Sequence, residues 1–161
     1  MKKLLIISIF LLNYFFVYCD QVDSKWNKIL NDVLPIELKD LRLINDNDIK
    51  DQNNLEIIKE RNPDYVFKIN DKNSKSHIVL PCKSKKKTND WYIVIIQEDH
   101  AKYKLVNYFN YKFRSFFVFK LIFNHKEYIH LGEYISSDFF IDLIWDGKSY
   151  KEFGKTVNLT K

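Results

Sequence analysis

The fold is decided by residues 91–153, which read WYIVIIQEDHAKYKLVNYFNYKFRSFFVFKLIFNHKEYIHLGEYISSDFFIDLIWDGKSYKEF. Short runs rich in aromatic and β-branched residues alternate in this stretch with polar segments. The apolar runs cover residues 91–97, 103–109, 113–123, 128–131 and 139–145. Regularly spaced runs of this kind, with turn residues between them, predict the strands of an antiparallel sheet.

Two of these runs predict more than a strand. Residues 91–96 are apolar at nearly every position, which is typical of a central strand with both faces covered. Residues 139–145 continue through Asp146 and Gly147 into a further strand-like segment. An Asp-Gly pair between two strands favours a type I′ turn, in which both central residues have positive φ. We therefore expect a tight hairpin at this pair.

The chain before this stretch predicts one more hairpin and two helices. Residues 65–69 and 76–80 resemble two strands on either side of a polar break, so they favour a hairpin. Residues 25–34 repeat apolar side chains at helical spacing, and we expect the face that carries Trp26 to pack on the sheet. Residues 55–60 predict a second helix.

Together these patterns predict an α+β fold. We expect a mainly antiparallel β-sheet of about six to eight strands, with one or two short N-terminal helices. Residues 20–161 form one domain in this interpretation, with a helical and polar lead-in over residues 20–62 and the sheet over residues 64–153. A chain of about 140 residues can bury roughly two-thirds of its unfolded surface, so its core needs no disulfide.

The last predicted hairpin carries a local resemblance. The segment Ile144-Trp145-Asp146-Gly147-Lys148-Ser149-Tyr150 resembles the Trp-Asp-Gly-Lys-x-Tyr hairpin that closes blades in some bacterial FG-GAP-like and VCBS-like surface repeats. The resemblance implies a β module that works outside the cytoplasm, and it attaches no function to the chain.

The N-terminus predicts export. Lys2 and Lys3 precede an apolar run over residues 4–17, which is the arrangement of a secretory signal peptide. The run is shorter than the roughly 20 residues that a helix needs to cross a bilayer. We expect residues 1–19 to be the signal peptide, and the protein to be secreted or held at the cell envelope, in the periplasm or on the outer surface.

Processing at Cys19 has two alternatives. The chain can be cleaved after Cys19, or cleaved behind Tyr18 with lipidation of Cys19, because a cysteine directly behind an apolar run resembles a bacterial lipobox. A lipid on Cys19 is the only membrane anchor that we expect. Either alternative leaves Cys82 without an intramolecular partner, and we interpret Cys82 as a small core residue.

Charge argues against a nucleic-acid partner. The chain has 26 basic and 21 acidic residues, a net charge of +5, and removal of Lys2 and Lys3 lowers it to 24 − 21 = +3 with both signs interspersed. One basic loop stands out at residues 83–87, and its lysines usually form a solvated turn that discourages strand pairing. They are also the candidate interaction surface for an anionic envelope polymer or lipid headgroup: Lys83, Lys85, Lys86 and Lys87.

No catalytic, cofactor or metal motif is present in the sequence. His77, His100, His125 and His130 are the histidines; His125 and His130 flank one connection, but a zinc site needs a third protein ligand. Residues 45–48 are rich in Asn and Asp, and we interpret them as a helix cap rather than a calcium loop, since the glycine and the spacing of an EF-hand are missing.

Asp142 is the most unusual acidic residue, because it lies between apolar neighbours in a predicted strand. A half-buried carboxylate would mark a candidate site, whereas an edge-exposed or lysine-paired one would be structural. Other carboxylates could pair for glycoside hydrolysis, although a chain with 21 acids offers many such pairs. They are Glu98, Asp99, Glu127, Glu133 and Asp138.

The sequence favours a non-catalytic protein that binds another macromolecule, either a protein or an envelope polymer. Ten tyrosines among the aromatic residues leave rings to spare for contacts outside the core. The alternative is a small secreted hydrolase that uses sheet-edge carboxylates or histidines. Residues Asn158-Leu159-Thr160 also match a glycosylation pattern.

Overall fold

A computed structural model describes residues 25–62, 65–70, 76–100, 102–135 and 139–156. The chain divides into two compact units, residues 1–39 and 40–161. In the first unit a helix runs over residues 25–33 and a 3₁₀ turn, η1, covers Ile36–Leu38. The predicted first helix is thus confirmed, and the packing of its Trp26 face stays a prediction. The signal peptide, Cys19 and the glycosylation pattern lie outside the described residues.

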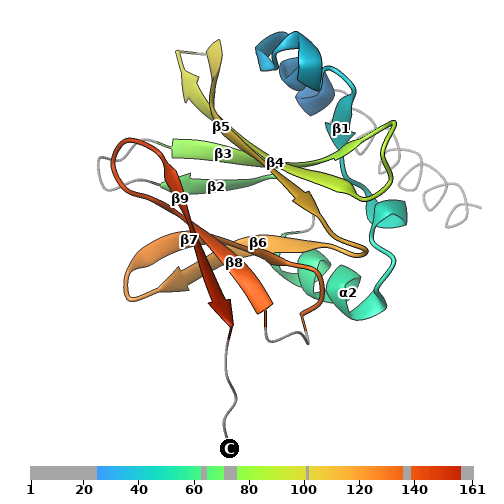
Figure 1. Cartoon of the computed structure of the whole chain (residues 1–161). Helices are drawn as coiled ribbons and strands as arrows, with labels where there is room; N and C mark the ends of the chain where they lie inside the picture. Colours follow the sequence, from blue (N-terminus) through green and yellow to red (C-terminus); the bar gives the residue numbers. More distant parts are fainter. Residues whose placement is uncertain (1–24, 63–64, 71–75, 101, 136–138, 157–161) are drawn as a thin grey trace, which may run out of the picture. The chain divides into compact units, whose positions relative to one another are not determined.

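The second unit contains two sheets. The first, sheet A, has five strands, and all of its strand pairs are antiparallel. β3 has β4 on one side, and both β1 and β2 pair with its other side (Figure 1). β5 lies next to β4. The strands are β1 (Leu41–Leu43), β2 (Phe67–Asn70), β3 (Ser76–Ser84), β4 (Asp90–Asp99) and β5 (Lys102–Lys112).

The second sheet, sheet B, is a meander of four antiparallel strands in chain order. The strands are β6 (Phe117–Phe123), β7 (Lys126–Gly132), β8 (Phe139–Trp145) and β9 (Tyr150–Thr156). Two helical elements precede these strands in the chain, the 3₁₀ turn η2 (Asp46–Asp48) and the helix α2 (Gln52–Arg61). α2 packs on β6.

The predicted α+β class with mainly antiparallel sheet is confirmed. The described residues hold nine strands in two sheets, so the expected range of six to eight is one too low. The additional strand is β1, which lies in the segment interpreted as a helical and polar lead-in. Its three residues make a strand because Leu41 and Leu43 pair with the end of β3, a long-range contact that local pattern does not reveal.

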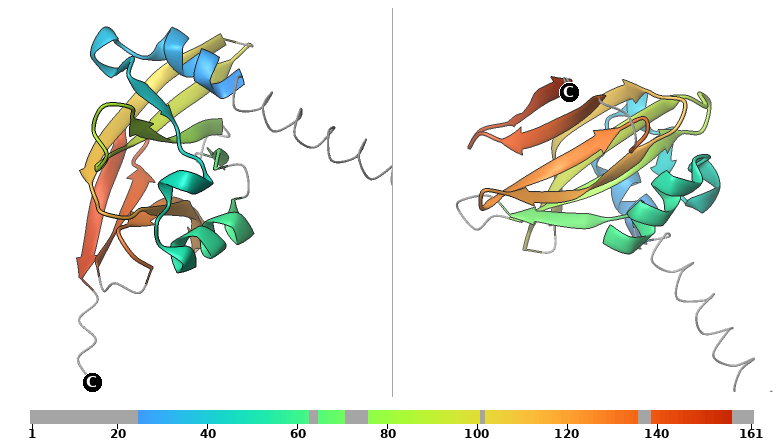
Figure 2. Two further views of the ribbon diagram at one scale, coloured as in Figure 1. Left: turned by 90° about the vertical axis from the view of Figure 1, so that its right-hand side faces the viewer. Right: turned by 90° about the horizontal axis from the view of Figure 1, so that it is seen from below.

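The two sheets of the second unit face each other across one apolar core (Figure 2). Trp91 of β4 stacks on Phe116, with ring centroids 4.8 Å apart, and donates its Nε1–H to the carbonyl of Phe113 at 2.9 Å. His77 of β3 hydrogen-bonds through Nδ1 to the hydroxyl of Tyr150 in β9 at 2.9 Å. Residues 91–96 form the expected central strand, covered on both faces apart from the half-buried Tyr92.

Pro81 shows why β3 can carry a proline inside the sheet. The carbonyl of Pro81 accepts a hydrogen bond from the Ile44 N–H at 3.1 Å, on the side where β2 ends and β1 begins to pair. β2 pairs with β3 up to Val79, and β1 pairs with it from Cys82 onward, so Pro81 lies between the two ladders. The missing N–H of Pro81 therefore falls at the end of a ladder and not inside one.

The tight turns differ from the expected ones. The β8–β9 hairpin is confirmed, but positive φ occurs at Gly147 and not at Asp146, so the predicted type I′ turn is wrong. The carboxylate of Asp146 instead accepts the N–H groups of Lys148 and Ser149, at 2.8 and 2.9 Å. The two-residue turn with positive φ at both positions is Asn124-His125 between β6 and β7.

Candidate functional site

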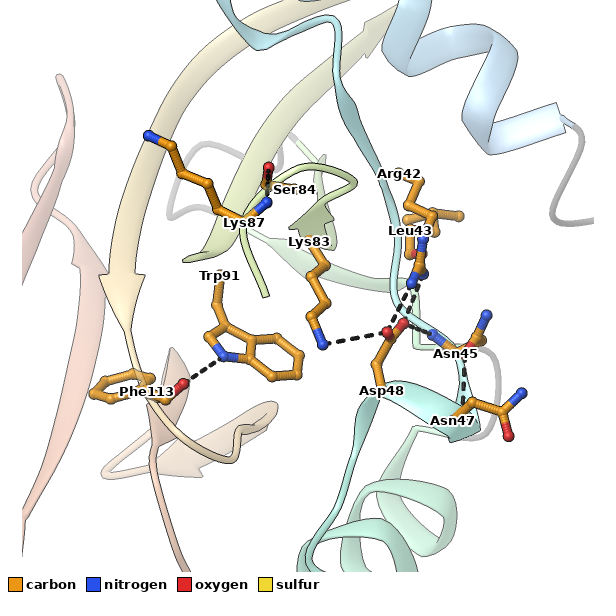
Figure 3. Close-up of polar contacts among 10 residues, drawn as sticks. All are labelled: Arg42, Leu43, Asn45, Asn47, Asp48, Lys83, Ser84, Lys87, Trp91 and Phe113. Carbon is orange, nitrogen blue, oxygen red and sulfur yellow. Dashed lines mark hydrogen bonds and ion pairs between the residues drawn. The ribbon is translucent and has the colours of Figure 1, made fainter. Parts of the chain in front are cut away.

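Lys83 does not belong to the exposed loop in which the sequence placed it. It pairs with Trp91 inside sheet A and is 9% exposed. Its Nζ lies 3.4 Å from Asp48 and 4.4 Å from the centroid of the Trp91 ring. Figure 3 shows this lysine pointing toward the Asp48 carboxylate. The assignment of Lys83 to an interaction surface is therefore corrected, because the side chain neutralises a buried acid.

Asp48 is the centre of this polar cluster. Arg42 donates to both of its carboxylate oxygens, at 2.6 and 2.7 Å (Figure 3). The N–H of Asn45 donates to Asp48 at 3.0 Å and completes the capping box of η2. The cap expected at residues 45–48 is present, but Asp48 is buried and not solvated as we expected. Burial alone would raise the pKa of Asp48, but the hydrogen bonds from Arg42 and Asn45 and the charges of Arg42 and Lys83 together hold the pKa below its usual value.

The remaining lysines of the predicted surface are exposed. Lys85, Lys86 and Lys87 lie in the turn between β3 and β4. The N–H groups of Lys86 and Lys87 donate to the hydroxyl of Ser84, at 3.1 and 3.0 Å, which fixes the turn while their side chains stay in solvent. Their role as an interaction surface stays a prediction.

Two residues that the sequence singled out separately, His130 and Asp142, lie together. They are directly opposite each other on β7 and β8, and Nδ1 of His130 is 2.7 Å from Oδ1 of Asp142. Their side chains are 16% and 11% exposed. Asp142 is thus nearly buried and paired with a histidine, so neither the edge-exposed nor the lysine-paired interpretation is correct. In the neutral imidazole, with the carboxylate as acceptor, Nδ1 donates and Nε2 is the proton acceptor.

The pair lies in a row of side chains that crosses all four strands of sheet B. The strand register places Phe119, His130, Asp142 and Phe153 opposite one another in turn, and residues opposite one another share a face. The neighbouring positions Leu131, Ile141 and Leu143 are buried and point to the opposite face of the sheet. We name the side of sheet B that carries this row the His130 face.

Aromatic rings surround His130 on this face. The centroid of its ring lies 5.5 Å from Phe117, 5.1 Å from Phe119 and 4.7 Å from Phe140. The guanidinium of Arg61, from the last turn of α2, lies 4.7 Å from the centroid of the Phe119 ring. The rings hold the imidazole in place from several sides.

The His130 face also has an exposed apolar part. Phe153 is 53% exposed, and Phe123, which alternation along β6 puts on the same face, is 60% exposed. Lys126, directly opposite Phe123, and Lys151, two residues before Phe153 on β9, are exposed cations at the same side of the sheet. The face therefore combines exposed rings with basic side chains.

The other histidines do not join His130. His125 lies in the turn between β6 and β7 and is exposed, and His100 is exposed beside Asp99. His77 is buried between the sheets. Within the described ranges, no group of three or more His, Cys, Asp or Glu side chains is arranged to hold a metal ion.

Cys82 is buried, as the sequence predicted. Its thiol donates to the carbonyl of Leu80 at 3.3 Å, and burial raises the pKa of the thiol. A protonated thiol without access to solvent is a poor nucleophile.

The candidate carboxylates lie in separate surroundings. Glu98 pairs with Lys68 and Glu127 with Lys120, whereas Glu133 accepts the backbone N–H of Arg114. Asp138 lies outside the described residues. Asp99 is exposed and lies 3.6 Å from His100. Glu98, Glu127 and Glu133 are thus each held in a separate contact.

No family model, no curated protein and no solved structure matches this chain. The resemblance of residues 144–150 to FG-GAP-like hairpins stays a prediction. In the part of the chain that the structure describes, no helix is both long and apolar enough to cross a membrane.

Sequence reasoning missed Arg61 and the extent of the His130 face. Alternation along residues 117–123 would have put Phe117, Phe119 and Phe123 on one side of a strand. The placement of that strand next to Asp142 depends on the register of two strand pairs, β6–β7 and β7–β8, which sequence pattern alone does not supply.

Proposed function

We propose that the protein works outside the cytoplasm as a non-catalytic binding protein, and that the His130 face contacts an acidic segment of another protein. One observation carries the proposal: two phenylalanines on this face, Phe123 and Phe153, are more than half exposed. Exposed apolar side chains gathered on one face and bordered by polar ones are typical of interaction sites.

The charge of the face selects the partner. Arg61, Lys126 and Lys151 are basic, and the one acid among the face's strand positions, Asp142, is nearly buried and paired with His130. A second copy of the chain would bring the same cations together, which is unfavourable. An acidic segment with apolar side chains would satisfy both the rings and the cations.

Photo-crosslinking tests the proposal. A photoreactive phenylalanine analogue is placed at Phe153 or, as a matched control, at Tyr108 of sheet A, which is 41% exposed. In the cells that produce the protein, we expect a defined crosslinked partner from position 153 and none from 108. Binding of the purified partner should weaken about tenfold or more in Phe153→Ser and weaken with added salt, because rings and charges both contribute.

Tyr108→Ser should bind the partner as the unchanged protein does, because Tyr108 lies on the other sheet. Both substitutions are at exposed positions, so the free energy of unfolding should change by less than about 0.5 kcal/mol in each variant. Equal crosslinking from both positions, or equal loss of binding in both variants, would refute the proposal.

The His130–Asp142 pair favours one second candidate, a secreted hydrolase in which His130 accepts a proton from water. A carboxylate that accepts from Nδ1–H leaves Nε2 as the base in many hydrolytic sites. The rings around His130 include no described nucleophile, so water would be the attacking group. A partner that is recovered intact after long incubation supports binding, and a partner that is shortened supports hydrolysis.

A further inference from the structure

A cleft lies at the start of α2. It has a volume of about 510 Å³, which is in the range of small-ligand sites. Segments from four places in the chain form it: the link before α2, the β3–β4 turn, the β5–β6 link and the segment after β7. Its lining residues are Lys50, Asp51, Asn89, Arg114, Ser115 and Tyr134.

The charge of this cleft is positive. Lys50 and Arg114 are exposed, and neither side chain makes an ion pair with any other described residue. The two acids nearby are already engaged by backbone donors: Asp51 accepts the Asn54 N–H at 2.9 Å as the cap of α2, and Glu133 accepts the Arg114 N–H at 2.9 Å. The lining therefore has two cations and one acid, and neither cation is paired within the described ranges.

Neutral donors complete the lining. Ser115 is 2% exposed, and its oxygen accepts from Asn54 Nδ2 at 3.2 Å, which leaves the hydroxyl proton to be donated. The Tyr134 hydroxyl and the Asn89 amide also line the cleft and have no hydrogen-bond partner among the described residues. A serine hydroxyl, a phenol and an amide beside two cations form a donor-rich site.

Asn54 gives the cleft a fixed frame. It is fully buried and joins α2 to the segment after β7: Nδ2 donates to the Glu133 carbonyl at 2.8 Å, and Oδ1 accepts the Ile135 N–H at 3.0 Å. Because the same side chain also holds Ser115, the segments that carry Arg114, Ser115 and Tyr134 are positioned before a ligand binds.

We propose that this cleft binds an oxyanion, a phosphate or carboxylate group of a small ligand, with Arg114 and Lys50 neutralising its charge. Guanidinium groups bind both oxyanions with two parallel hydrogen bonds, and a lysine adds a second positive charge. Asn89 belongs to the same turn as Lys85, Lys86 and Lys87, whose exposed charges raise the local concentration of anions. The proposal is independent of the partner assigned to the His130 face.

Titration of the purified protein with inorganic phosphate tests the site, with nuclear magnetic resonance following the amide of Ser115 at constant ionic strength. We expect a saturable shift in the unchanged protein. Arg114→Gln and Lys50→Gln should each weaken phosphate binding about tenfold, since each removes a charged hydrogen-bond donor. Lys148→Gln, which removes an exposed lysine from the β8–β9 turn, should bind phosphate as the unchanged protein does.

A parallel titration with acetate separates the two ligand classes. Acetate that displaces phosphate supports a carboxylate site, and phosphate binding that acetate does not disturb supports a phosphate site. A shift that does not saturate, or the same loss of binding in Lys148→Gln as in Arg114→Gln, overturns the proposal, because either result means only a general attraction of anions to a basic protein.

Discussion

At the scale of single residues, Asp48 makes the contacts with the largest expected effect on stability. Replacing it by Asn keeps the shape but leaves Arg42 and Lys83 facing each other without an anion. Loss of one partner from a buried pair costs several kcal/mol, and Arg42 is about one-third exposed, so we expect Asp48→Asn to lower the free energy of unfolding by about 2 kcal/mol. Urea unfolding at neutral pH measures this difference.

Asp46→Asn is the matched control, because Asp46 also binds a lysine, Lys59 at 2.7 Å, but its side chain is 55% exposed. We expect this substitution to lower the free energy of unfolding by less than about 1 kcal/mol.

The contribution of Asp48 to stability should depend on pH, because its pKa is lowered in the folded protein. The contribution is complete above the unfolded carboxyl pKa of about 4, and it is lost as pH falls through the lower pKa of the folded state. The gap between Asp48→Asn and the unchanged protein should therefore narrow below about pH 4. A gap that is the same at pH 7 and pH 3 would contradict this account.

At the scale of elements, the β8–β9 hairpin depends on the backbone of Gly147. Its φ is +105°, a conformation that L side chains rarely adopt, and an added Cβ would meet no atom within 4 Å. Gly147→Ala should therefore lower the free energy of unfolding by about 1 kcal/mol through backbone strain alone. Gly154 lies in β9 with the same open surroundings but without a positive φ, so Gly154→Ala should change stability by less than about 0.5 kcal/mol. Thermal unfolding of both variants measures their stabilities. Equal losses of stability in the two variants would mean that positive φ at Gly147 adds no strain when a side chain is present.

The turns also mark how far sequence pattern could predict the elements. The strands were predictable because alternation and β-branched content are local properties. Turn geometry was not, since Asp146 uses its carboxylate to accept two N–H groups and Asn124-His125 takes the double positive φ instead. Asn and His both tolerate positive φ better than most residues. This preference was the one indication of the turn at Asn124-His125 that the sequence contained.

At the scale of the whole molecule, the site could be predicted only in part, because sequence pattern reports local properties and not long-range contacts. His130 and Asp142 each stood out in sequence, but their pairing depends on the β7–β8 register. Lys83 was misplaced because a lysine beside other lysines resembles a solvated loop, whereas its partner Asp48 lies 35 residues earlier in the chain (83 − 48). Long-range pairing of charges is therefore the part of this protein that local pattern could not supply.

Export of the whole molecule can be tested at its N-terminus. Two lysines and the apolar run of residues 4–17 predict removal of a leader, so we expect the protein recovered from its host to have lost residues 1–18 or 1–19. Mass spectrometry of the intact protein separates the two outcomes. A chain that begins with Asp20 indicates a released protein. A diacylglyceryl group on Cys19 indicates an anchored one, because two acyl chains suffice for stable membrane attachment.

A Lys2→Glu, Lys3→Glu variant should be processed more slowly, since the basic residues before the apolar run are part of the export signal. Lys28→Glu, Lys39→Glu changes the same number of charges outside the leader and should be processed as the unchanged chain is. An intact Met1 on the mature protein would refute export by this leader and, with it, the extracytoplasmic part of the proposed function.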